Sequence, residues 1–128
     1  NFYNFIIYGL FDENEIETRF IKSCINKCKE EKPIIVHKNK KMDFFHMKDL
    51  LLLIDECLED KIKTSELECV YWEIYDLCSI ARIVIKEMGK GSIILGETGL
   101  ADPYIRVGRP FRRGNLEERI IQTIGELK

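Results

Sequence analysis

One stretch, residues 42–54, restricts the fold of this chain more than any other. It begins as a short apolar extended piece, and a predicted helix over residues 49–58 follows a polar joint. In its first turns this helix is apolar on every side, because residues 50–54 are four leucines and an isoleucine. A helix that is apolar all round is covered on several faces. A chain of 128 residues offers few elements to cover it.

Size and composition describe one ordinary globular domain, which we expect to span residues 1–128. Apolar residues make up 45% of the chain and charged residues 33%, a balance that indicates a packed core. The net charge of −2 gives no reason to expect a nucleic acid or a membrane surface as a partner. No apolar run approaches the roughly 20 residues of a membrane span. The chain begins with Asn1 and runs at once into a predicted strand, which we interpret as a cut inside a longer polypeptide.

Five cysteines, an odd number, form no C-x-x-C pair. Cys24 and Cys28 are four residues apart on a predicted helix, a spacing that would allow two thiols to share a metal ion. A four-coordinate zinc site needs two more ligands at matching spacing, and the sequence presents none. We therefore interpret the cysteines as reduced thiols that pack as small apolar side chains. An intracellular, cytoplasmic location follows as the expectation.

Turn residues and apolar spacing predict helices that alternate with short strands. The expected strands cover residues 5–8, 34–36, 42–47, 67–72 and 92–95, and the clearest helices cover residues 49–58 and 77–88. Asp12 or Asn14, then Asp76, and finally Asn115 are expected to act as helix N-caps. Gly89 is expected to end its helix in the left-handed conformation. This alternation predicts an α/β fold, or α+β for this piece taken alone.

Two of the predicted helices carry an apolar stripe with polar residues opposite, which is typical of a helix with one buried face. The stripe of the first helix consists of Ile16, Phe20, Ile21, Cys24, Ile25 and Cys28. The stripe of the last helix consists of Leu116, Ile120, Ile121 and Ile124. Residues 38–41 are expected to form a basic turn, and residues 96–114 an irregular stretch.

Six weak motifs follow one another in an order known from one enzyme family. They are Phe-Ile-Ile-Tyr-Gly at 5–9, Lys-Pro-Ile-Ile-Val at 32–36, Met-Asp-Phe-Phe-His-Met-Lys-Asp-Leu at 42–50, Val-Tyr-Trp at 70–72, Asp-Leu-Cys-Ser-Ile-Ala at 76–81 and Asn-Leu-Glu-Glu-Arg-Ile at 115–120. In this order the chain resembles the C-terminal part of the extended short-chain dehydrogenases, the NAD-dependent nucleotide-sugar epimerases and dehydratases. The third motif is similar to the segment that links the two halves of those enzymes.

The resemblance implies a substrate-binding domain that completes a Rossmann-type two-domain enzyme whose N-terminal part is absent from this sequence. NAD or NADP would be bound by that missing domain, and none by this chain. The implied partners are a nucleotide-diphosphate sugar, the missing NAD-binding domain and a second copy of the protein in a homo-oligomer. Residues 50–54 and 5–8 would then pack on the missing nucleotide-binding sheet.

The chain lacks two features that hydride-transfer enzymes of this family need. No glycine-rich turn opens a predicted helix to cradle a pyrophosphate, and Gly89-Lys90-Gly91 and Gly96-Glu97-Thr98-Gly99 are interpreted as ordinary turns. No tyrosine is followed four residues later by a lysine. Alone, the chain is therefore expected neither to bind NAD nor to turn over substrate.

The candidate substrate-binding residues are Lys41, His46, Tyr104, Arg106 and Arg109. Lys41 directly precedes the position where the family carries an arginine, and it would supply a point charge without the guanidinium fork. His46 occupies the histidine or tyrosine position of the linking motif, where a hydrogen-bonded structural role competes with ligand contact. The two arginines and Tyr104 lie where the resemblance implies a second phosphate contact. Surface charge is the alternative role for the lysine and both arginines.

Three substitutions at family positions leave a second hypothesis open. Ile6 replaces a substrate-contacting asparagine, Met42 replaces the arginine, and Lys48 replaces the first aspartate of an aspartate pair. They favour a non-catalytic binding or regulatory module on the same scaffold. A third hypothesis, a thiol- or metal-dependent enzyme, depends on the cysteines alone.

Overall fold

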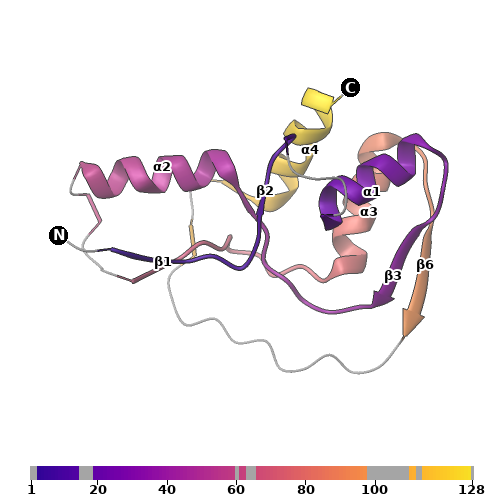
Figure 1. Ribbon diagram of the computed structural model, residues 1–128, viewed down its shortest axis with the longest axis horizontal. Coiled ribbons are helices and arrows are strands. Elements are labelled where there is room, and N and C mark those ends of the chain that lie inside the picture. The colour runs from indigo at the N-terminus through magenta and orange to yellow at the C-terminus, as the bar shows by residue number, and fades with distance from the viewer. Residues whose placement is uncertain are drawn as a thin grey trace.

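Helices alternate with short parallel strands in the computed structural model, which describes residues 3–14, 19–59, 61–62, 66–97, 110–111 and 114–127 (Figure 1). The strands are β1 (Asn4–Ile6), β2 (Leu10–Phe11), β3 (Ile34–Lys38), β4 (Phe45–His46), β5 (Glu66–Glu68) and β6 (Ile93–Glu97). The helices are α1 (Phe20–Lys29), α2 (Met47–Leu58), α3 (Leu77–Met88) and α4 (Leu116–Leu127). The predicted α/β class is confirmed. No helix in these ranges is long and apolar enough to cross a membrane.

The described strands form three separate parallel pairs: β1 with β5, β2 with β4, and β3 with β6. Helices α1 and α3 pack on each other and on β3, where Ile34 and Val36 are buried. Helix α4 contacts α3, while α2 runs above β1 toward the N-terminus (Figure 1).

Helix α3 shows how well local capping residues predict a helix. Its bounds are the predicted ones, and the carboxylate of Asp76 accepts a hydrogen bond from the backbone N–H of Ser79 at 2.7 Å. At the other end Gly89 has φ +76°, the left-handed conformation that costs little without a side chain. Both predictions for this helix are confirmed.

Helix α1 begins later than predicted, at Phe20, with Arg19 as its N-cap. The Asp12 carboxylate instead accepts a hydrogen bond from the N–H of Asn14 at 2.9 Å, in a local turn. The Asp12 side chain therefore caps this turn and not the helix. The buried stripe holds through Ile21, Cys24, Ile25 and Cys28, whereas Ile16 lies outside the described residues.

Within the described part of the chain α2 is covered on one face only, so its coverage by a missing sheet stays a prediction. Leu50, Leu53 and Cys57 are buried on one face, but Leu51 is 54% exposed and Leu58 is 79% exposed. Figure 1 shows the reason, because the helix extends beyond the other helices with β1 below it. It also begins two residues earlier than predicted, at Met47.

The strands are mostly shorter than their apolar runs suggested. β1 ends at Ile6, and the next two residues are exposed, so this strand is not buried on both faces as predicted. β4 and β5 occupy only parts of the predicted strands 42–47 and 67–72. β3 is longer than predicted and includes Lys38, which therefore does not belong to a turn.

Helix α4 is capped as predicted, because the side-chain oxygen of Asn115 accepts a hydrogen bond from the N–H of Glu118 at 2.8 Å. Leu116, Ile120 and Ile124 are buried, but Ile121 is 38% exposed and does not belong to the buried stripe. Ile121 lies one position past Ile120, about 100° around the helix, which turns it away from the core.

Candidate functional site

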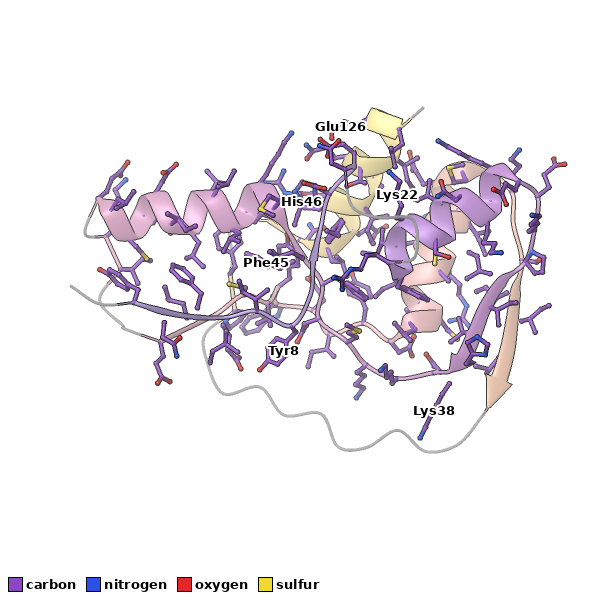
Figure 2. All side chains as sticks on the ribbon, viewed as in Figure 1. Tyr8, Lys22, Lys38, Phe45, His46 and Glu126 are labelled. Atoms are coloured by element: carbon purple, nitrogen blue, oxygen red, sulfur yellow. The ribbon has the colours of Figure 1, made fainter. Side chains whose placement is uncertain are left out.

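The carboxyl ends of β1 and β5 form the candidate ligand site. The two strands are parallel, with Ile6 opposite Glu68, so the residues that follow each strand emerge at the same edge. Here the hydroxyl of Tyr8 donates to the Glu68 carboxylate at 2.7 Å. Figure 2 shows Tyr8 on the opposite side of β1 from α2. In parallel sheets this edge is where ligands bind.

Exposed aromatic and aliphatic side chains, which we call the rim, follow the two paired strands: Ile7 and Tyr8 come after β1, and Trp72 and Ile74 come after β5. Trp72 is 61% exposed and Ile74 44%, while Ile7 and Tyr8 are each about two-fifths exposed. Large apolar side chains grouped on a surface mark an interaction site more often than scattered ones do. Flat aromatic faces beside a hydroxyl and a carboxylate suit a ligand that combines a planar ring with hydroxyl groups.

Lys41 lies next to the segment that follows Ile74. Lys41 forms an antiparallel bridge with Asp76, and the N–H of Met42 donates to the carbonyl of Tyr75 at 3.1 Å. Residues 41–42 therefore run alongside the segment that leads away from Trp72. Lys41 is exposed, so its ammonium group is accessible to an anionic part of a ligand at this edge.

The N-terminus of α3, beside the same segment, has no spare donors for an anion. The N–H of Leu77 donates to the carbonyl of Lys40 at 2.9 Å, and that of Cys78 to the side chain of Asn39 at 3.1 Å. The third N–H, that of Ser79, donates to the carboxylate of Asp76. Burial raises the pKa of Asp76, but the bonds from Ser79 and Asn39 outweigh it and hold that pKa below its usual value.

His46 is buried and serves the start of α2. Its Nδ1 accepts a hydrogen bond from the N–H of Lys48 at 3.0 Å, which makes His46 the N-cap of the helix. The ring meets Phe11 edge to face at 5.0 Å, and Nε2 has no hydrogen-bond partner among the described residues. Burial and the charge of Arg119 lower the pKa of His46. These contacts support the structural role; ligand contact by His46 stays a prediction.

Tyr104, Arg106 and Arg109 lie outside the residues that the structure describes. Substrate binding by Tyr104 and phosphate contact by Arg106 or Arg109 stay predictions based on the sequence.

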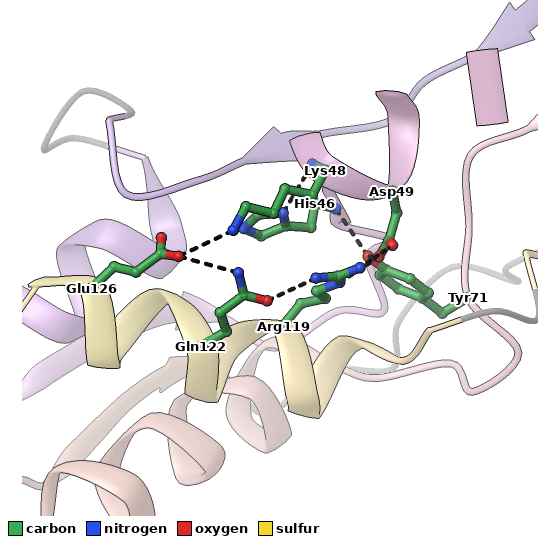
Figure 3. Close-up of polar contacts among 7 residues, drawn as sticks. All are labelled: His46, Lys48, Asp49, Tyr71, Arg119, Gln122 and Glu126. Carbon is green, nitrogen blue, oxygen red and sulfur yellow. Dashed lines mark hydrogen bonds and ion pairs between the residues drawn. The ribbon is translucent and has the colours of Figure 1, made fainter. Parts of the chain in front are cut away.

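A buried ion pair is the feature that sequence reasoning missed (Figure 3). Arg119 donates from Nε to Asp49 Oδ2 at 2.9 Å and from Nη2 to Asp49 Oδ1 at 2.5 Å. The hydroxyl of Tyr71 donates to the same carboxylate and accepts from the N–H of His46 at 3.1 Å. Asp49 has no exposed surface. Burial and the bond to Asp49 raise the pKa of Tyr71, so its hydroxyl stays protonated.

The sequence did contain a sign of this pair. Asp49 falls on the same helical face as Leu50, Leu53 and Cys57, and a charge on an apolar face requires a buried partner. The partner could not be identified, because Arg119 is 70 residues away and belongs to a different helix.

The ion pair continues along one face of α4 (Figure 3). Arg119 Nη1 donates to Gln122 at 2.7 Å, and Gln122 donates to Glu126 at 3.1 Å. Glu126 also pairs with Lys48 at 3.2 Å. The start of α2 is thus held to α4 at a buried point and at an exposed one.

The cysteines lie in the core. All five are free thiols and all are buried. Burial raises the pKa of Cys24 to about 12 and that of Cys69 to about 11, so these thiols are not nucleophilic at neutral pH. This confirms their interpretation as small apolar side chains and weighs against a thiol enzyme.

The described glycines do not fit a dinucleotide cradle. Gly89 ends α3, and Gly91 (φ +134°) packs so closely that an added Cβ would lie 2.8 Å from the sulfur of Cys28. Neither opens a helix, which is the arrangement that binds a pyrophosphate.

Comparison with solved structures identifies the fold. The chain matches UDP-N-acetylglucosamine 4-epimerase from Bacillus cereus with a TM-score of 0.76 at 13% identity, over 98% of this chain and 46% of that one. It matches dTDP-glucose 4,6-dehydratase from Bacillus anthracis, in complex with NAD, with a TM-score of 0.70 at 12% identity, over 94% and 42%. A variant of UDP-glucuronic acid 4-epimerase from Bacillus cereus, bound to a fluorinated UDP-sugar and NAD, gives 0.69 at 14%, over 97% and 45%.

The chain thus spans less than half the length of these structures, and at such identities the likeness shows the fold alone. No protein-family model matches the sequence, and no curated protein matches it.

Proposed function

We propose that this chain, which has the fold of slightly less than half of a nucleotide-sugar epimerase or dehydratase, is the C-terminal, substrate-binding domain of such an enzyme. The domain comprises residues 1–128. The observation that carries the proposal is the fold match over nearly the whole chain, together with six motifs in the family's order. The substrate is a nucleotide-diphosphate sugar held at the carboxyl ends of β1 and β5.

In this proposal, different residues at this edge bind different parts of the ligand. Trp72 and Tyr8 offer aromatic faces to a base or a sugar ring. Lys41 supplies positive charge for the diphosphate, and Arg106 and Arg109 add charge from the segment that follows Tyr104. The role of this chain is to bind and orient the sugar.

The redox step belongs to residues outside this chain. In the intact enzyme, bound NAD or NADP would supply the hydride-transfer chemistry. This sequence has neither the glycine-rich turn nor the Tyr-x-x-x-Lys pair that such chemistry requires. In this proposal His46 contributes indirectly, by capping the start of α2.

The second candidate function is a non-catalytic binding or regulatory module. Met42 and Ile6 favour it, since they stand where the family binds the diphosphate and contacts the sugar. Such a module would bind a nucleotide sugar weakly, or another ligand, at the same edge.

Calorimetric titration with UDP-glucose and a GDP-sugar tests the proposal. The wild-type chain should bind one of them, and Lys41→Ala, Arg106→Ala and Arg109→Ala should each weaken binding about tenfold, by loss of a charged phosphate contact. Lys86→Ala, on the exposed side of α3, is the matched control and should bind normally. Unchanged binding in all three variants would show that these residues do not form the ligand site.

The coding sequence immediately upstream of Asn1 separates the two candidates. A glycine-rich turn and a Tyr-x-x-x-Lys pair encoded there would support the enzyme. A coding sequence that holds neither would favour the module.

A further inference from the structure

The Asp49–Arg119 ion pair is connected to the exposed rim of the candidate site through one residue. Tyr71 bonds through its hydroxyl to Asp49 and directly precedes Trp72 in the chain. Asp49 lies in the first turn of α2, and Arg119 lies near the start of α4. Two helices and the segment after β5 therefore meet at one carboxylate (Figure 3).

Tyr71 is fixed at both of its ends. Its backbone forms a parallel bridge with Phe111, whose N–H donates to the carbonyl of Val70 at 2.7 Å. Its ring packs against Phe45 at 4.9 Å and against Phe111 at 6.4 Å. Its hydroxyl is held by Asp49 and by the N–H of His46. A residue held in this way fixes the backbone direction of its neighbour.

The direction of Trp72 follows from that of Tyr71. The two residues are consecutive but have opposite environments. Tyr71 is only 2% exposed, whereas Trp72 is 61% exposed. Because Tyr71 is held in the core by Asp49, the backbone that it fixes directs the next side chain, Trp72, to the surface.

The two-point geometry of the Asp49–Arg119 ion pair fixes the position of the carboxylate that Tyr71 contacts. A guanidinium that donates two parallel bonds to one carboxylate fixes both distance and orientation, which an ammonium group cannot do. Gly114 adds to the fit, because a Cβ at this position would lie 3.1 Å from Asp49 Oδ2. Apolar side chains would fill the same space without fixing one orientation.

We infer that Arg119 and Asp49 are positioning residues for the ligand site: through the hydroxyl of Tyr71 they set the orientation of Trp72. The C-terminal helix thereby controls the rim although it contributes no residue to it. The effect on ligand affinity rests on the proposed function, whereas the effect on Trp72 does not.

The single tryptophan of the chain makes the inference directly testable. We would measure the emission maximum and the iodide quenching of Trp72 in the wild type, in Arg119→Lys and in Tyr71→Phe. Arg119→Lys keeps the charge but loses the two-point geometry, and Tyr71→Phe removes only the hydroxyl. Arg82→Lys, at an exposed position of α3, is the matched control. Circular dichroism restricts the comparison to folded samples.

Both test variants should change the emission and quenching of Trp72, while Arg82→Lys leaves them unchanged. UDP-glucose binding should weaken about tenfold in both variants, because a reoriented Trp72 no longer offers its ring to the ligand. Wild-type Trp72 spectra in folded Arg119→Lys and folded Tyr71→Phe would overturn the inference. Altered spectra in a chain whose wild type binds no nucleotide sugar would support the inference and count against the proposed function instead.

Discussion

Asp49 and Arg119, which are 70 residues apart in the chain, form a two-point ion pair with N–O distances of 2.5 and 2.9 Å. The carboxylate is fully buried, and the guanidinium side chain is 19% exposed. Because each charge has lost most of its water, each depends on the other. The bond to Asp49 raises the pKa of Arg119 further above its already high value, so the pair remains ionised.

Replacement of one partner of the ion pair should therefore lower the free energy of unfolding far more than replacement of both partners. Arg119→Met leaves a buried carboxylate without its partner and should lower the free energy of unfolding by about 3–5 kcal/mol. The double variant Asp49→Leu/Arg119→Met should recover most of that loss. Urea unfolding of the three proteins measures both effects.

The exposed Lys32–Glu30 pair, at 3.3 Å, is the control for this experiment. Lys32→Gln should change stability by less than about 1 kcal/mol, since water screens the pair. Equal losses in Arg119→Met and in the double variant would show that the ionic interaction is not what stabilises the junction of α2 and α4.

Two glycines of the C-terminal region should respond to alanine in opposite directions. Gly114→Ala places a Cβ 3.1 Å from Asp49 Oδ2, a carboxylate that Arg119 prevents from moving, and should destabilise by about 1–3 kcal/mol. Gly125→Ala lies within α4 with nothing within 4 Å and should stabilise by about 0.5–1 kcal/mol. Thermal unfolding gives both values. Destabilisation by Gly125→Ala would mean that α4 does not extend that far.

The elements that could be predicted from the sequence are those decided within a few residues. Asp76 and Gly89 act on their own helix, and α3 has the predicted bounds. The start of α1 was mispredicted because Asp12 had two local uses for its carboxylate, and spacing alone does not choose between a helix cap and a turn.

Features decided by distant contacts escaped prediction. The exposure of Leu51 depends on how many layers cover α2, which no local pattern reports. The partner of Asp49 comes from α4, and the partner of Tyr8 lies 60 residues away in β5. For the candidate site, Lys41 was proposed from its place in the linking motif, and its ligand contact stays a prediction. The exposure of Trp72 could not be read from the local sequence.

Stability should fall in mildly acidic solution because of His46. Its pKa is lowered in the folded state by burial and by Arg119, so the unfolded chain binds a proton more readily. The free energy of unfolding should be independent of this residue above the unfolded pKa of about 6.5. As the pH falls below that value it should drop by at most about 1.4 kcal/mol per pH unit, until the lower folded-state pKa is reached.

The variant His46→Asn isolates this effect, because asparagine also caps a helix but does not titrate. Its stability between pH 7 and 5 should change less than that of the wild type. His37→Gln, at an exposed position of β3, should keep the wild-type difference. An identical pH profile in wild type and His46→Asn would contradict the assignment.

Removal of the exposed indole should lower ligand affinity more than it lowers the stability of the fold. Trp72→Ala should raise the dissociation constant of a bound UDP-sugar by about tenfold, since a stacked ring contributes about 1–3 kcal/mol. The melting temperature should change little, because Trp72 is 61% exposed. Trp72→Phe keeps an aromatic face and should bind almost normally. Equal affinity in Trp72→Ala would place the ligand elsewhere.

The open face of α2 leads to a prediction about association. Leu51 and Leu58 are exposed, and Ile7 and Tyr8 follow β1, whose described pairing is with β5 alone. Exposed apolar side chains and unpaired strand edges recruit partners, so the chain by itself should self-associate. Light scattering should detect dimers or larger species at micromolar concentration. Leu51→Glu/Leu58→Glu should shift them toward the monomer, whereas Lys27→Glu/Lys86→Glu on α1 and α3 should not. A wild-type chain that is monomeric and binds no dye for exposed apolar surface would show that these exposed side chains do not drive association.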